Sequence, residues 1–310
     1  MKVIFMGTPD FAVGALDAIV EAGHEVALVV TQEDKPKGRG KEIQFTPVKE
    51  AAIKHGIEVY QPHRVKYEDA VAKLREYNAD VFVVAAYGQI LSKELLEMPK
   101  YGCVNIHASL LPKYRGAAPI QWSIIDGEKV TGVTTQMMAE GIDTGDILDV
   151  IEVEIDKEET GGSLFDKLTV AGSEVILTTL KKLEDGTVTR TPQDHSKSTY
   201  AKMLDKKLGN IDFSMSAEEI ERLIRGLNPW PSAYTMYKGK TLKVWKAEVI
   251  EKDYDGQLGQ IVDKTKKAVM VKTGNGALAI TELQLEGKKR MTTEAFLCGA
   301  GFELGEMLGI

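Results

Sequence analysis

The stretch Cys-Val-Asn-Ile-His places an amide and an imidazole two residues apart, in Asn105 and His107. Side chains two apart on an extended strand leave the same face, so both groups can point at one reacting carbonyl. Asp143, within Gly-Ile-Asp-Thr-Gly, supplies a carboxylate that can orient the imidazole. An amide, an imidazole and a carboxylate with no serine or cysteine nucleophile between them predict direct acyl transfer through a tetrahedral intermediate.

These side chains need a scaffold, and the first 185 residues alternate strand and helix patterns. Near-continuous apolar strands separated by helices indicate a Rossmann-like, mostly parallel sheet covered on both faces, an α/β fold. Ligands bind at the carboxyl ends of the strands in such sheets, which is where Asn105 and His107 stand. The predicted strands are Lys2–Met6, Glu25–Thr31, Ala79–Ala86, Gly102–Ile106 and Ile147–Val153, and the predicted helices include Pro9–Ala22 and Gly161–Leu183.

Beyond Leu208 the pattern changes to short strands separated by glycine-containing turns. Five such strands in succession suggest a small β-barrel of the oligonucleotide-binding (OB) type. A polar stretch separates the two parts, so we predict a catalytic domain over residues 1–188, a linker over 189–206 and an OB-like domain over 207–310. The five strands lie near Ala233–Tyr237, Thr241–Ile250, Gly259–Val262, Ala268–Lys272 and Leu278–Leu285, after a short helix over Ala217–Arg225.

The two cysteines, Cys103 and Cys298, fall in different predicted domains and indicate neither a disulfide framework nor a metal cluster. Cys103 is close enough to Asn105 for a nucleophilic role to be considered. Because it stands in an apolar run, we interpret it as a buried small thiol. No histidine or cysteine cluster accompanies the carboxylates around Asp143, so we expect no metal. This cysteine usage fits a reducing cytoplasm.

The composition is that of a globular chain, with 43% hydrophobic and 27% charged residues over a length of 310 that favours two domains. No apolar run reaches the roughly 18 residues of a membrane span, and we expect no signal peptide. The charge is uneven, because residues 206–310 carry 16 basic and 14 acidic side chains whereas the rest carry 23 and 32. A slightly basic C-terminal part on an acidic chain is compatible with RNA contact.

Several segments resemble the formyltransferase family that uses 10-formyltetrahydrofolate, and the resemblance covers most of the chain. The Asn-x-His pair and the later aspartate mark the family as a whole. Phe5-Met-Gly-Thr-Pro-Asp-Phe11, Asn228-Pro-Trp-Pro231 and Lys243-Val-Trp-Lys-Ala247 narrow the match within it. The resemblance implies that 10-formyltetrahydrofolate, as co-substrate and without a metal, gives its formyl group to the amino group of initiator methionyl-tRNA in the cytoplasm.

By the same resemblance, two segments carry the family's folate contacts. From the residues alone, the first is equally an ordinary strand-to-helix turn, although the backbone beside Gly88 could hold a flat heteroaromatic ring. Arg115, close to the second, could meet a carboxylate or a phosphate, or form a structural ion pair. The two segments are Tyr87, Gly88, Gln89, Ile90 and Leu91, and Ser109, Leu110, Leu111 and Pro112.

Residues 32–46 join a strand to a helix through a connection longer than usual, and they carry four basic side chains, Lys35, Lys37, Arg39 and Lys41. A mobile basic loop at the carboxyl end of the sheet suits closure over a phosphate-bearing partner, although a solvated charged loop also explains the composition. In family members that act on methionyl-tRNA, a loop with Gly-Arg-Gly enters the acceptor stem. The resemblance therefore implies tRNA binding by these residues, with Arg39 foremost.

Other functions stay open at this point. A sugar-nucleotide formyltransferase would share the catalytic residues but carry a different loop, and a glycinamide ribonucleotide formyltransferase should lack the barrel. A nicotinamide-dependent oxidoreductase could use a similar sheet, but the turn after the first strand has only Gly7 and Gly14 instead of G-x-G-x-x-G. A non-catalytic RNA-binding protein would not need Asn105, His107 and Asp143. Nothing in the sequence indicates a membrane or an obligate protein partner.

Overall fold

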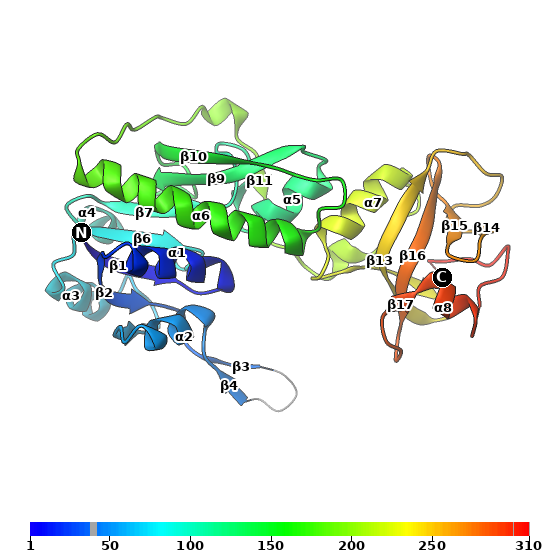
Figure 1. Ribbon diagram of the computed structural model, residues 1–310, viewed down its shortest axis with the longest axis horizontal. Helices are drawn as coiled ribbons and strands as arrows, with labels where there is room; N and C mark the ends of the chain where they lie inside the picture. Colours follow the sequence, from blue (N-terminus) through cyan, green and yellow to red (C-terminus); the bar gives the residue numbers. More distant parts are fainter. Residues whose placement is uncertain (38–41, 300, 310) are drawn as a thin grey trace. The chain divides into compact units, whose positions relative to one another are not determined.

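The computed structural model of the chain describes residues 1–37, 42–299 and 301–309 (Figure 1). The fold consists of two compact units, each assembled from segments that are distant in the sequence. Unit 1 comprises Met1–Pro119, Val130–Glu154 and Phe165–Ala201, and unit 2 comprises Ile120–Lys129, Ile155–Leu164 and Lys202–Ile310.

Unit 1 is built on a seven-stranded sheet of order β10-β9-β7-β6-β1-β2-β5. The strands from β5 to β7 run parallel, and β9 and β10 extend the sheet antiparallel beyond β7. The predicted mostly parallel, Rossmann-like sheet is thus confirmed. The seven strands are β1 (Lys2–Gly7), β2 (Glu25–Val30), β5 (Val59–Tyr60), β6 (Val81–Ala85), β7 (Cys103–His107), β9 (Val130–Met137) and β10 (Ile147–Glu154).

Helices cover both faces of this sheet, as apolar parallel strands require. On one face the Phe11 ring of α1 (Asp10–Glu21) packs edge-on against Phe165 of α6 (Gly161–Glu184), with 5.9 Å between the ring centroids. On the other face Cys103 of β7 joins a buried cluster with side chains of two further helices, α3 and α4. The remaining helices of this part of the chain are α2 (Pro47–Lys54), α3 (Glu68–Glu76), α4 (Lys93–Glu97) and α5 (Pro119–Ile125), the last of which continues into unit 2.

Residues 189–201 of the predicted linker pack against unit 1 rather than standing apart from it. The backbones of Thr191 and Ile147 exchange hydrogen bonds of 2.8 and 2.9 Å, and β11 (Tyr200–Ala201) pairs in parallel with β8 (Arg115–Gly116). This segment is polar because it is held by backbone hydrogen bonds and by buried amides more than by apolar side chains. Its composition resembles a linker, but its contacts are those of a fixed extended segment.

Unit 2 holds an antiparallel sheet of order β12-β13-β16-β15-β14, with β17 paired to β16. Its five main strands match the predicted ones to within two residues at each end, and so does its first helix. The elements are β12 (Ala233–Tyr237), β13 (Lys240–Ile250), β14 (Ile261–Lys264), β15 (Val269–Lys272), β16 (Ala277–Leu285), β17 (Met291–Thr292), α7 (Ala217–Gly226) and α8 (Thr293–Leu297).

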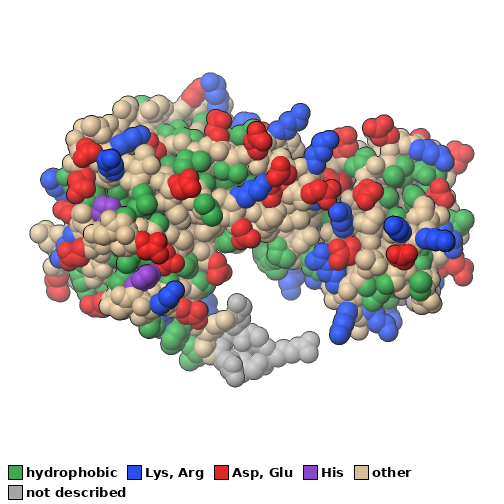
Figure 2. Space-filling model, viewed as in Figure 1, with side chains coloured by type: hydrophobic (Ala, Val, Ile, Leu, Met, Phe, Trp, Pro, Cys, Tyr) green, Lys and Arg blue, Asp and Glu red, His purple; other side chains and the backbone are tan. Residues whose placement is uncertain are grey.

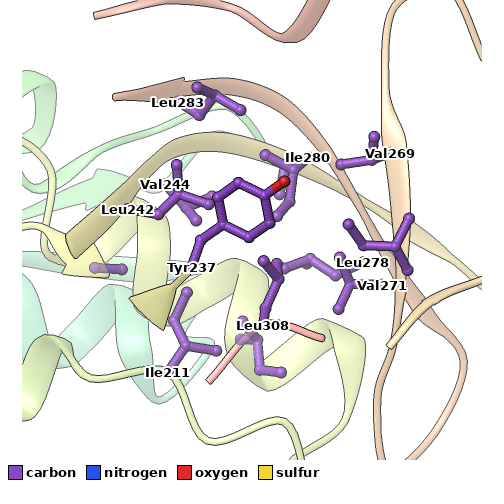
Figure 3. Packing of buried hydrophobic residues seen from close by; sticks show 14 of the residues in the cluster. Ile211, Tyr237, Leu242, Val244, Val269, Val271, Leu278, Ile280, Leu283 and Leu308 are labelled. Carbon is purple, nitrogen blue, oxygen red and sulfur yellow. The ribbon is translucent and has the colours of Figure 1, made fainter. Parts of the chain in front are cut away.

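The core of unit 2 lies between this sheet and its helices. Ser216 begins α7 with a capping box, in which its hydroxyl accepts from the backbone N–H of Glu219 and the Glu219 carboxylate accepts in return. The buried face of α7 presents Ile220 and Ile224 to strand residues. Figure 3 shows Tyr237 surrounded by aliphatic side chains of this cluster. The unit therefore has a hydrophobic core of its own.

No helix in the described part of the chain combines the length and the apolar character needed to cross a bilayer.

Candidate active site

Strand β7 places Asn105 and His107 where the sequence pattern predicts them. Both belong to the strand and project on the same side as Cys103, since side chains alternate along a strand. In the pairing with β9, Asn105 stands opposite Gln136 and His107 opposite Thr134. The imidazole is buried and the amide is half-buried. His107 is the last residue of β7, so the pair lies toward the carboxyl end of this strand.

Asp143 reaches the same place from a turn between β9 and β10. Its Oδ1 lies 3.5 Å from Nδ2 of Asn105 and 3.7 Å from Nδ1 of His107. Its backbone has a φ of 51°, in the left-handed region that aspartate tolerates better than most residues. The three residues predicted to be catalytic therefore converge, although their chemical roles stay a prediction.

The tautomer of His107 follows from its partners. Nε2 lies 2.8 Å from the carbonyl oxygen of Tyr114, and a carbonyl can only accept, so Nε2 carries the proton. Nδ1 is then the nitrogen that can gain or lose a proton, and it faces the carboxylate of Asp143. An imidazole nitrogen facing a carboxylate is a geometry in which the carboxylate can orient the ring.

The Asp143 carboxylate is held by two donors that the sequence does not reveal as site residues. Nε2 of Gln136 donates to Oδ1 at 2.9 Å, and the backbone N–H of Gly116 donates to Oδ2 at 2.8 Å. Gln136 occupies the β9 position opposite Asn105. Each oxygen of the carboxylate thus accepts a hydrogen bond. These two bonds fix the orientation of the Asp143 carboxylate relative to the ring of His107.

Arg115 is buried, and its guanidinium contacts an amide and an imidazole. Its Nε and Nη2 donate to Oε1 of Gln193 at 3.1 and 2.6 Å, and Nη2 lies 2.9 Å from Nδ1 of His195. Nε2 of Gln193 in turn donates to the carbonyl oxygens of Asp143 and Gly145. Arg115 therefore belongs to the support of the Asp143 turn.

The loop after His107 is built on one threonine of β9. The hydroxyl of Thr134 donates to the carbonyl of Ser109 at 2.6 Å and accepts from the N–H of Leu111. The Ser109 hydroxyl is buried and donates to the carbonyl of Lys113. Among the four predicted folate contacts here, only Leu110 and Pro112 keep partly exposed side chains. Any folate contact of Ser109 and Leu111 would have to use their backbone.

The segment Tyr87–Leu91 also contains both buried and exposed side chains. The Tyr87 ring lies in the apolar cluster under the sheet, and its carbonyl accepts from the Thr8 hydroxyl at 3.0 Å and from Nε2 of Gln32. Leu91 is buried, whereas the Ile90 side chain is 76% exposed. A surface pocket of about 320 Å³ lies at this segment, lined by Gly88, Gln89, Ile90, Arg64 and Lys66.

A substitution can show whether the phenol of Tyr87 or only its backbone contributes to folate binding. The hydroxyl of Tyr87 is buried without a hydrogen-bond partner in the described structure, and burial raises the pKa of its phenol. We expect Tyr87→Phe to raise the free energy of unfolding by about 1 kcal/mol and to leave folate affinity within about twofold. Denaturant titration and a folate binding assay check this.

The matched control is Tyr77→Phe, which removes a made hydrogen bond of 2.7 Å to Glu58 and should lower stability slightly. Weaker folate binding by the Tyr87 variant would mean that the phenol itself meets the ligand.

The base of the predicted basic loop is an antiparallel hairpin, β3 (Lys35–Lys37) and β4 (Glu42–Gln44). A buried hydrogen bond of 2.8 Å between the Thr31 and Thr46 hydroxyls ties its two ends together. The Asp34 carboxylate also accepts from Lys49 and Gln61. Lys35 is exposed, whereas Arg39, Lys41 and the side chain of Lys37 lie outside the described residues.

Cys103 takes no part in this chemistry. Its thiol is buried and donates to the carbonyl of Leu95 at 3.3 Å, and burial raises its pKa, which disfavours the reactive thiolate. The interpretation of a buried small thiol is confirmed, and both Cys103 and Cys298 are free thiols. No group of three or more histidine, cysteine or acidic side chains in the described residues is arranged to hold a metal ion.

Comparison with known proteins identifies the family of the chain. Residues 1–180 match the family described as Formyl transferase, and residues 203–301 match its C-terminal domain. The chain belongs to the formyl transferase family. It is 58% identical, over 98% of each chain, to a protein of Agathobacter rectalis named methionyl-tRNA formyltransferase. A protein of the same name from Lachnospira eligens is 56% identical over the full length of both chains.

Among solved structures, this formyl transferase chain resembles a sugar 3N-formyl transferase, WlaRD, crystallised with dTDP and 5-N-formyl-THF. The TM-score is 0.68 and the match covers 93% of this chain and 99% of the other, at 20% sequence identity. At that identity the likeness speaks for the fold alone. It supports the α/β architecture followed by a smaller C-terminal unit.

Proposed function

We propose that this chain transfers the formyl group of 10-formyltetrahydrofolate to the free amino group of initiator methionyl-tRNA, giving N-formylmethionyl-tRNA for translation initiation. The observation that carries the proposal is the convergence of Asn105, His107 and Asp143 at the end of β7, in a chain 58% identical to a protein named for this reaction. A cytoplasmic location belongs to the proposal and fits the two free thiols.

In this reaction the amine nitrogen forms a bond to the formyl carbon, and the bond from that carbon to N10 of the folate breaks. Asn105 donates a hydrogen bond to the oxygen that becomes negative in between. His107 receives a proton at Nδ1 and delivers one to the departing N10, while its Nε2 keeps its own proton and donates a hydrogen bond to the Tyr114 carbonyl. Asp143 orients the ring and stabilises its protonated form. One proton leaves the amine and one reaches N10, so the transfer balances.

The pocket beside Gly88 supports a folate as donor. The exposed Ile90 offers an apolar edge and Gly88 an accessible backbone for a flat ring, and Arg64 and Lys66 suit the anionic end of such a molecule. We assign the folate contacts to residues 87–91 and 109–112 as predicted from the sequence. The exposure pattern favours the backbone of Gly88 and the side chains of Ile90, Leu110 and Pro112.

Recognition of the tRNA is assigned to the basic loop and to unit 2. The loop leaves a hairpin anchored by buried hydrogen bonds, so its basic side chains are carried by a fixed base. On the face of the molecule in Figure 2, lysine and arginine side chains of unit 2 are interspersed with acidic ones. A surface of mixed charge is better suited to positioning the phosphate backbone of the tRNA than to attracting it strongly.

The test is formyl transfer from labelled 10-formyltetrahydrofolate, with charged initiator tRNA, charged elongator tRNA and a UDP-amino sugar offered in parallel. Label on initiator methionyl-tRNA alone is the expected result. Label on the sugar nucleotide would retain the chemistry of the site and overturn the assignment of the acceptor. No transfer to any amine would overturn the proposed function.

The basic loop should control the tRNA and not the folate. We expect Arg39→Ala to lower kcat/KM for initiator methionyl-tRNA by about tenfold or more, the cost of a lost charge-assisted contact, with folate affinity within about twofold. If Arg39 meets a phosphate, the slope of log kcat/KM against log salt also falls by about one.

Steady-state kinetics at several salt concentrations checks this prediction. Lys54→Ala, an exposed lysine of α2 outside the loop, is the matched control and should change neither value. An equal loss of folate affinity in the Arg39 variant would contradict the assignment of the loop.

A further inference from the structure

One buried side chain outside the predicted catalytic set connects Arg115 to the active-site turn through the two ends of its amide. Gln193 lies in the segment whose composition predicts a linker, yet it is only 6% exposed. Its Oε1 accepts two hydrogen bonds from Arg115, of 3.1 and 2.6 Å. Its Nε2 donates to the carbonyl oxygens of Asp143 at 2.9 Å and Gly145 at 2.7 Å. The neighbours thus fix which end of the amide is which, because Arg115 only donates and the carbonyls only accept.

The turn that presents Asp143 needs such a clamp. Asp143 adopts a φ of 51°, a conformation that is strained for a residue with a side chain and persists only when its surroundings hold it. Gly145 lies so close to the backbone of Met137 that a Cβ would stand 1.6 Å from its carbonyl oxygen. The turn is therefore pressed onto β9, with two carbonyl groups that a single side-chain amide satisfies.

The support acts on both ends of the aspartate. Arg115 reaches the backbone carbonyl of Asp143 through Gln193, and the N–H of the next residue, Gly116, donates directly to the Asp143 carboxylate at 2.8 Å. A guanidinium that donates to the amide oxygen polarises the amide and strengthens the donation from its nitrogen. The orientation of one carboxylate is thus set by two adjacent residues and one glutamine.

We propose that Gln193 is a positioning residue for the reaction, which holds the Asp143 carboxylate against the imidazole of His107. This inference rests on the proposed function, and it adds a residue from the polar segment 189–201 to the machinery of that site. All five hydrogen bonds of the side chain go to protein groups, the fifth being a long one of 3.5 Å from Nε2 to Oε1 of Gln136, so Gln193 acts through the turn and its neighbours and touches no substrate. A small displacement of the turn moves the carboxylate, and an error of about 1 Å in such a group can cost about a hundredfold in rate.

Two substitutions of the full-length chain test the clamp. Gln193→Glu keeps an acceptor for Arg115 but turns an anion toward two carbonyl oxygens, and Gln193→Met fills a similar volume with no polar group. We expect kcat to fall about 10- to 100-fold in each, with KM for folate and for the amine acceptor within about twofold. Asp194→Asn, the exposed neighbour, is the matched control and should stay within about twofold.

A double-mutant cycle with Asp143→Asn separates positioning from general damage to the fold. If Gln193 works through Asp143, Gln193→Glu lowers kcat by less than about threefold once the carboxylate is gone, because coupled losses do not add. If the full 10- to 100-fold loss remains in the Asp143→Asn background, or if KM rises in place of a fall in kcat, the proposal is overturned. If Gln193→Glu does not fold, Gln193→Met carries the same cycle.

A second readout does not depend on the substrate. The ring nitrogens of His107, observed by ¹⁵N NMR and assigned through His107→Gln, should shift in Gln193→Glu in the same direction as in Asp143→Asn. Unchanged ring resonances would overturn the clamp even if activity fell. Failure of the wild type to formylate methionyl-tRNA would instead overturn the proposed function, while the resonances would still report on the clamp.

Discussion

We expect replacement of His107 by alanine to lower kcat for formyl transfer by about a thousandfold or more, within the 10²–10⁴ range of general acid–base catalysis. In the proposed mechanism the imidazole exchanges a proton at Nδ1 while Nε2 stays hydrogen-bonded to the Tyr114 carbonyl. Its loss would remove the group that delivers a proton to N10. Rapid-quench single-turnover kinetics measures the loss directly in the chemical step.

Two further variants isolate the proton transfer from packing. His107→Gln keeps a donor for the Tyr114 carbonyl and much of the buried volume, but its amide cannot shuttle a proton, so we expect a similar loss. His24→Ala is the matched histidine control, since His24 contacts the N-terminus and lies outside the site. A His107→Ala enzyme with nearly wild-type turnover would contradict the mechanism.

We expect replacement of Asn105 by alanine to lower kcat by about 10²–10³, the loss typical when one preorganised donor to an oxyanion is removed. Nδ2 of Asn105 is a suitable donor because its hydrogen bond to Oδ1 of Asp143 is long at 3.5 Å. That bond is weak enough to be exchanged for one to a substrate oxygen. The affinity for both substrates should change little, since the donor acts on charge that develops only during the reaction.

Asn105→Asp gives the sharper comparison. It has nearly the same shape, but it removes the donor and sets a second carboxylate beside Asp143, so its kcat should fall at least as far as that of the alanine variant. Equilibrium binding of folate, measured for both variants, controls for a damaged pocket. An Asn105→Asp enzyme as active as the wild type would show that the amide N–H is not needed.

The catalytic pair is predictable from sequence because it depends on a local rule. Asn105 and His107 are two apart on an apolar strand, and strand alternation alone brings them to one face. Asp143 is a different case, since its turn meets β7 only through the antiparallel pairing of β9. No periodicity joins residues 105 and 143, and the resemblance to a family supplied that link.

The residues that hold Asp143 in place could not be predicted from a local sequence rule. Gln136 belongs to β9, whose polar sequence Thr-Gly-Val-Thr-Thr-Gln has little of the apolar run that identifies a buried strand. Gln193 lies in a segment whose composition predicts a linker. Gln193 is fixed by partners far away in the sequence and Gln136 by an aspartate seven residues on, and a glutamine carries no signature that distinguishes a clamp from a surface residue. Only the three-dimensional pairing brings them to Asp143.

The folate segments show a related limit. The segment around Tyr87 is where the sequence places it, at the end of β6, but the tyrosine ring turns into the apolar cluster and leaves its backbone at the edge. The hydroxyl of Ser109 likewise donates its hydrogen bond within its own loop, to the carbonyl of Lys113. A sequence motif identifies a stretch of chain, whereas the direction of each side chain depends on packing from other elements.

Gly116 connects the active-site aspartate to the segment that follows α6. Its N–H donates to the Asp143 carboxylate, its backbone pairs with Ala201, and its φ is 107°. A Cβ there would stand 2.7 Å from the Tyr200 ring and 2.8 Å from the Ala201 carbonyl oxygen. A side chain at this position would therefore disturb the donor to the aspartate and displace the segment after α6 in one step. That segment contacts the Asp143 turn at Gln193 and the strand β8 at Ala201, so a change of length between the two contacts would displace one of them.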